Sequence, residues 1–175
     1  MEGKTLNNSF GAKVIPSAMT LTNLLFGILS LVFTMEDAFR WAAYAILFAV
    51  IMDGMDGRVA RRFEASSSFG KELDSLADLV SFGVAPAILT YAKYMHLPFG
   101  NIGLAVAIIF ALCGAVRLAR FNVLNITTHF VGVPITVAGG FVALFSLMHL
   151  PALFYPIVSL VLAFLMVSTF KVPKY

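Results

Sequence analysis

Apolar runs long enough to cross a bilayer, separated by short polar segments, make up most of this chain. A helix needs about 20 predominantly apolar residues to span the hydrocarbon core. Turn residues such as Pro98 and Gly100 lie between the runs. The pattern predicts an all-α integral membrane protein with six transmembrane helices, five of them at about 14–34, 39–55, 70–94, 102–120 and 134–149, and a sixth that follows Pro151 and ends near residue 170.

The first 13 residues are polar and include Lys4 and Lys13. We expect them to form a short N-terminal interfacial segment, such as an amphipathic helix. A signal peptide is the alternative, because basic residues precede an apolar run. That run is long enough to span the bilayer, and no small-residue cleavage site follows it, which favours a first transmembrane helix.

Composition supports one membrane domain that covers residues 1–175. Of the 175 residues, 60% are hydrophobic and only 12% are charged, which is typical of membrane proteins. The single cysteine, Cys113, excludes an intramolecular disulfide and a cysteine-rich metal site. The net charge of +3 is spread over loops and helix ends, which favours contact with anionic lipid headgroups over nucleic acid.

The distribution of basic residues predicts the orientation in the membrane. Six helices place both termini on one side, and that side holds ten of the twelve lysines and arginines, leaving only Arg40 and Lys93 on the other. Because cytoplasmic loops are enriched in basic residues, we expect both termini to be cytoplasmic in a multi-pass protein of the cell membrane.

Four of the nine acidic residues lie in one stretch between apolar runs: Asp53, Asp56, Asp74 and Asp78. On a helix, Asp53 shares a face with residues three, four, seven and eight positions later, which are Asp56, Gly57, Ala60 and Arg61. Gly70, Asp74 and Asp78 recur every four residues and share a second face. Two helix ends brought together would gather the four carboxylates, with glycine and alanine leaving room beside them.

Clustered carboxylates repel one another, and ionisable groups at membrane depth are costly. Divalent cations stabilise such a cluster because hard cations take oxygen ligands. Two metals a few ångströms apart suit phosphoryl transfer. The alternative, that the acids only pair with nearby lysine and arginine, leaves the small residues unexplained. We therefore predict Asp53, Asp56 and Asp74 as metal ligands, with Asp78 completing the second metal site.

The stretch that begins at Asp53 reads D-x2-D-G-x2-A-R-x8-G-x3-D-x3-D. It resembles the signature of the CDP-alcohol phosphotransferases, and every fixed position matches. The resemblance implies the fold of that family, two divalent cations (Mg²⁺ or Mn²⁺) and a homodimer. It also implies that Asp78 is the general base that takes a proton from the attacking alcohol.

The same resemblance gives roles to the other motif residues. It implies that Gly57, Ala60 and Gly70 leave space for the CDP moiety and that Arg61 contacts the diphosphate, which suits a guanidinium group. The alternative for the small residues is helix packing, because small side chains let membrane helices approach closely.

Thr20 and Asn23 lie inside the first predicted span. Family members that use CDP-diacylglycerol often carry P-N-x-x-T-x-x-N here, and this chain matches from Pro16 to Asn23 except that Ser17 replaces the first asparagine. The resemblance implies that Thr20 and Asn23 contact the CDP-lipid. A threonine at membrane depth can instead bond to its own backbone.

A second informative stretch is R-L-A-R-F-N, from Arg117 to Asn122, followed by G-V-P at 132–134. Both resemble the phosphatidylserine synthase branch of the family. The resemblance implies that Arg117, Arg120 or both bind an anionic group, either the serine carboxylate or a lipid phosphate. The alternative is that both arginines only anchor the helix end in the cytoplasm.

Taken together, the resemblance predicts transfer of a phosphatidyl group from CDP-diacylglycerol to L-serine, with release of CMP. One alternative is a sister enzyme that uses glycerol 3-phosphate or inositol phosphate, for which a denser basic pocket is expected. Another is a divalent-cation transporter, which would need further acids along the remaining spans.

Overall fold

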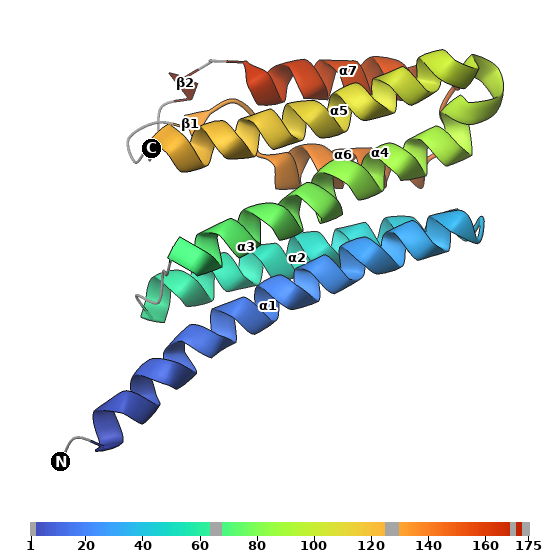
Figure 1. Ribbon diagram of the computed structural model, residues 1–175. Helices are drawn as coiled ribbons and strands as arrows, with labels where there is room; N and C mark the ends of the chain where they lie inside the picture. The colour runs from blue at the N-terminus through green and yellow to red at the C-terminus, as the bar shows by residue number, and fades with distance from the viewer. Residues whose placement is uncertain (1–2, 64–67, 125–129, 169–170, 173–175) are drawn as a thin grey trace.

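The computed structural model describes residues 3–63, 68–124, 130–168 and 171–172, and this part of the chain is almost entirely helical (Figure 1). The prediction of an all-α protein is therefore confirmed, apart from one antiparallel pair of two-residue strands. In chain order, the elements are α1 Gly3–Met35, α2 Phe39–Phe63, α3 Ser68–Asp78, η1 Leu79–Val84, α4 Ala85–Thr90, η2 Tyr91–Met95, α5 His96–Leu124, β1 Phe130–Val131, α6 Ile135–Ser146, α7 Phe154–Val167 and β2 Lys171–Val172.

Within the described residues, two segments are long and apolar enough to cross a membrane, Ala18–Met35 and Phe69–Val123. The second has 55 residues, and as one straight helix it would extend roughly 80 Å, far beyond the hydrocarbon core. It turns back at Gly100, whose φ of 48° is not helical, so α5 runs beside the rod formed by α3, η1, α4 and η2 (Figure 1).

The last two apolar helices are shorter than predicted. Helix α6 has 12 residues and α7 has 14. At 1.5 Å per residue, these lengths give roughly 18–21 Å, which is less than the thickness of the hydrocarbon core. The order of helical rods matches the prediction, but their lengths alone do not establish six membrane crossings.

Helix α1 is continuous from Gly3 to Met35, so the predicted N-terminal segment and first span form one helix rather than two. Its first turns extend away from the other helices (Figure 1). The helix ends in a turn that reverses the chain: Asp37 adopts φ 57°, and the amide of Ala38 donates to the carbonyl of Phe33 at 2.8 Å. This pattern is a Schellman motif, and it lets α2 start at once and return along α1.

Close helix contacts at small residues hold the centre of the bundle together. A Cβ atom on Gly27 of α1 would lie 2.9 Å from the Cα of Ser81, and one on Gly139 of α6 would lie 2.7 Å from the Cα of Phe82. Ser81 and Phe82 belong to η1, which directly follows α3, so these contacts fix α3 against α1 and α6.

The outward faces of the helices carry exposed apolar side chains. On α1 these recur every three or four residues, at Leu21, Leu25, Ile28 and Val32, each between 42% and 52% exposed. A continuous stripe of exposed apolar side chains is suited to contact with the lipid chains of a membrane.

A polar and aromatic cluster connects η2 to the end of α6 and the start of α7. The element η2 lies at the end of the bundle that holds the α1–α2 turn (Figure 1). The rings of Tyr94 and Tyr155 stack with centroids 3.6 Å apart. Lys93 and Tyr94 donate hydrogen bonds to the carbonyl of Ser146, and Tyr155 donates to the carbonyl of Met148. The carbonyls at the C-terminal end of α6 thus have partners.

Candidate metal centre

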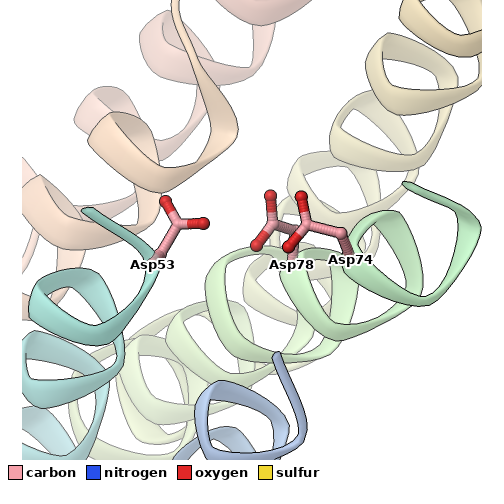
Figure 2. Close-up of side chains that lie close together, drawn as sticks. All are labelled: Asp53, Asp74 and Asp78. Atoms are coloured by element: carbon pink, nitrogen blue, oxygen red, sulfur yellow. The ribbon is translucent and has the colours of Figure 1, made fainter. Parts of the chain in front are cut away.

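Three of the predicted acids converge at the opposite end of the bundle. Asp74 and Asp78 lie one turn apart on α3, and Asp53 of α2 faces them (Figure 2). One carboxylate oxygen from each lies within 4.8 Å of the others. The four-residue spacing predicted from the sequence therefore corresponds to a shared face in the structure.

The remaining motif residues are placed only in part. Helix α2 contains Asp56, Gly57, Ala60 and Arg61, but the structure describes only the backbone of these four residues. Gly70 lies one turn before Asp74 on α3. The assigned roles of these residues, and convergence of the fourth carboxylate, remain predictions.

The chemistry of the cluster fits a hard divalent cation. Asp53 and Asp74 are half-buried and Asp78 is only 8% exposed, so water screens their mutual repulsion poorly. A positive charge placed between them would offset this repulsion, and oxygen ligands are those that Mg²⁺ and Mn²⁺ prefer. Among the described residues the group contains only carboxylates, which argues against a soft metal.

Asn23 of α1 lies directly against this cluster. Its side chain is fully buried, and its Nδ2 donates a hydrogen bond to Oδ1 of Asp78 at 3.1 Å. The hydroxyl of Ser81 donates to the backbone carbonyl of Asn23 at 3.0 Å. The side-chain oxygen Oδ1 of Asn23 is buried without a hydrogen-bond partner. Thr20, the other residue predicted from this stretch, lies nearly one turn earlier and is 5% exposed.

Thr136 of α6 contacts the cluster from the other side. Its hydroxyl donates to Oδ2 of Asp53 at 3.0 Å. Sequence reasoning did not identify Thr136. The available signal was its position two residues after Pro134, which is the N-cap residue of α6 and ends the G-V-P stretch.

The two predicted arginines have different surroundings. Arg120 donates from Nη1 to the carbonyl of Val167, the last residue of α7, at 3.2 Å. Arg117 is half-buried, its Nε is buried without a hydrogen-bond partner, and Asp78 acts on it electrostatically. Of the two, Arg117 is therefore the one associated with the acidic cluster.

Asn122, the last residue of the R-L-A-R-F-N stretch, joins α5 to α3. Its Nδ2 donates to the hydroxyl of Ser75 at 3.0 Å and to Glu72 at 3.4 Å. Ser75 follows Asp74, so this contact holds the α3 turn that carries two of the clustered acids.

Comparison of the sequence with known proteins identifies a family and several similar proteins. The family described as CDP-alcohol phosphatidyltransferase matches residues 13–170. Proteins named CDP-diacylglycerol–serine O-phosphatidyltransferase are similar to this chain: that of Helicobacter pylori strain J99 is 42% identical over 134 residues, covering 75% of this chain and 56% of the relative. That of Methanocaldococcus jannaschii is 38% identical over 162 residues (92% and 74%), and that of Bacillus subtilis 37% identical over 163 residues (92% and 90%).

Proposed function

Because this chain belongs to the CDP-alcohol phosphatidyltransferase family, we propose that it transfers the phosphatidyl group of CDP-diacylglycerol to L-serine and releases CMP. The observation that carries the proposal is the convergence of Asp53, Asp74 and Asp78, since this is the oxygen-rich site that a CDP-alcohol substrate requires. The choice of serine rests on the relatives, which are named for that acceptor.

Asp53, Asp74 and Asp78, together with Asp56, would hold Mg²⁺ or Mn²⁺. When bound, the cations neutralise charge on the diphosphate and on the departing CMP. Asp78 would accept the proton of the serine hydroxyl while the hydroxyl oxygen of serine forms a bond to the lipid-bearing phosphorus. The bond from that phosphorus to the CMP oxygen breaks, and CMP leaves. Gly57, Ala60, Gly70, Arg61 and Thr20 are proposed to contact the CDP-lipid.

For the acceptor, we assign Arg117 rather than Arg120 to the serine carboxylate. A buried guanidinium nitrogen without a partner is costly, and a bound carboxylate would satisfy it. Its electrostatic interaction with Asp78 supports a position near the reacting hydroxyl. Arg120 already donates to the end of α7, which supports an anchoring role.

We expect Arg117→Ala to raise the KM for serine by about 10- to 100-fold while the KM for CDP-diacylglycerol changes little. The reason is the loss of a charge-assisted hydrogen bond, worth roughly 1.5–3 kcal/mol. Steady-state kinetics with serine varied at saturating CDP-diacylglycerol would measure this. Arg120→Ala is the matched variant, because it removes the same side chain one turn away. A larger serine effect in Arg120→Ala than in Arg117→Ala would reverse the assignment.

The reaction itself is tested by CMP release from CDP-diacylglycerol by the purified protein. We expect release to require both serine and a divalent cation. Release with glycerol 3-phosphate or an inositol phosphate, but not with serine, would identify a sister activity. Metal flux into vesicles that contain the protein but no CDP-lipid, without any CMP release in the enzyme assay, would instead support a transporter.

We further propose that the six helical rods cross the cell membrane with both termini and the metal centre on the cytoplasmic side, and that the protein is a homodimer. The charge distribution supports this orientation. Arg40 is the second residue of α2 and Lys93 belongs to η2, and the start of α2 and η2 lie at the end of the bundle opposite α3 (Figure 1). A water-soluble acceptor would then reach the site from the cytoplasm, while the lipid substrate enters from the bilayer.

A further inference from the structure

Two of the three clustered carboxylates accept a hydrogen bond from a helix that contributes no acid to the cluster. Thr136 on α6 donates to Asp53, and Asn23 on α1 donates to Asp78. The two donors lie far from the acids in the sequence, with separations of 83 and 55 residues. The cluster is thus held from two sides by residues outside the aspartate motif.

Both donors are themselves held firmly. Asn23 is fully buried, its backbone carbonyl accepts a hydrogen bond from Ser81, and Gly27 allows α1 to approach η1 closely at this level. Thr136 lies in the first turn of α6, where the amide of Ala138 donates to the carbonyl of Pro134 at 3.0 Å. The branched side chain of threonine also restricts rotation at χ1. The backbone that carries each donor is therefore held in place beside the cluster.

The chemistry of the donors suits a metal centre. A hydroxyl and a carboxamide orient a carboxylate without neutralising its charge, whereas an arginine or lysine at the same place would compete with a cation. Each donor engages one named oxygen, Oδ2 of Asp53 and Oδ1 of Asp78, and so sets the rotation of the carboxyl group about its terminal bond. Groups that hydrogen-bond to metal ligands in this way typically change metal affinity 10- to 100-fold when removed.

We propose that Thr136 and Asn23 are positioning residues that orient Asp53 and Asp78 for divalent-cation binding. This inference rests on the metal centre of the proposed function. It assigns Thr136 a role that the sequence motif does not suggest, and it gives Asn23 a role exerted through Asp78 rather than through the nucleotide. The hydrogen bond from Nδ2 of Asn23 to Oδ1 of Asp78 supports this reading.

The test is a titration of the purified protein with Mn²⁺, in detergent and without substrates. The electron paramagnetic resonance signal of free Mn²⁺ measures how much of the ion is bound. We expect Thr136→Val, which keeps the shape but lacks the hydroxyl, to raise the dissociation constant for Mn²⁺ at least about 10-fold. Thr136→Ser keeps a hydroxyl and should restore most of the affinity. Thr34→Val is the matched control, because the hydroxyl of Thr34 donates only to the carbonyl of Ser30 on its own helix.

Thermal unfolding of each variant separates a binding effect from a loss of folding, and Thr136→Ala provides a smaller side chain if valine is not tolerated. An unchanged Mn²⁺ affinity in the folded Thr136 variants, with affinity lost in Asp53→Asn, would overturn the role of Thr136. The proposed function would survive that result, because it depends on the aspartates and on serine-dependent CMP release.

Asn23→Leu tests the second donor by the same titration, and we expect a similar weakening of Mn²⁺ binding. A higher KM for CDP-diacylglycerol with unchanged Mn²⁺ affinity would instead assign Asn23 to nucleotide contact and overturn its positioning role.

Discussion

Asp78→Asn is expected to abolish serine-dependent CMP release, by on the order of 10³-fold, while binding of CDP-diacylglycerol largely survives. The carboxamide has nearly the same shape as the carboxylate, so the fold is preserved, but it cannot take a proton from the serine hydroxyl. The low exposure of Asp78, 8%, makes replacement of the base by bulk water inefficient. The measurements are CMP release at saturating serine and equilibrium binding of CDP-diacylglycerol.

Glu72→Gln is the matched control for this prediction. It makes the same chemical change on the same helix, but Glu72 is exposed, and among the described residues it accepts a hydrogen bond from Asn122 at 3.4 Å, outside the acidic cluster. We expect its turnover to remain close to that of the unmodified protein. Turnover of Asp78→Asn at that same level would refute the base role. A parallel loss of CDP-lipid binding would attribute the lost turnover to the role of Asp78 as a metal ligand rather than to its role as a base.

Helical periodicity explains why part of the site could be predicted. Asp74 and Asp78 share a face because four residues are close to one helical turn, and this holds wherever the helix packs. The apolar runs likewise predicted the order of the helical rods, because a run of that length has few other stable arrangements in a bilayer. Local spacing was sufficient for both inferences.

The partners of the acids could not be predicted in the same way. Which face of α6 meets α2 depends on the rotation of both helices, and no local pattern encodes that rotation. Thr136 therefore carried no signal beyond its place after Pro134. The division between Arg117 and Arg120 has a similar origin: residues three apart on a helix differ in direction by roughly 60°, so one can face the cluster while the other reaches the end of α7.

Helix boundaries were also difficult to predict from apolar runs. The polar composition of the first 13 residues predicted a segment separate from the span that follows, but the structure continues one helix through both. The π-helical stretches η1 and η2 flank α4, whose second residue is Pro86. Such a local rearrangement changes the register of the backbone hydrogen bonds without changing hydropathy, so the apolar pattern does not detect it.

The contact between Gly139 and Phe82 connects the fold to the site. Phe82 lies four residues after Asp78, and Gly139 lies three residues after Thr136. The contact between α6 and η1 is therefore about one helical turn from the cluster along each of the two segments. The atoms nearest to a Cβ on Gly139 are the carbonyl oxygen and Cα of Phe82, which belong to the backbone. Backbone atoms cannot be moved by a change of side-chain rotamer.

We expect Gly139→Ala to lower the thermal stability of the protein in detergent by roughly 5 °C or more, because overpacking of this kind costs about 1–3 kcal/mol. Activity should fall further than the folded fraction, since displacement of α6 also moves Thr136 away from Asp53. Gly140→Ala is the matched control: its Cβ would meet only the side chain of Val50, at 3.3 Å, which can move aside. Equal melting temperatures for the two variants would show that the helices separate here at little cost, and that this contact does not set the geometry of the metal centre.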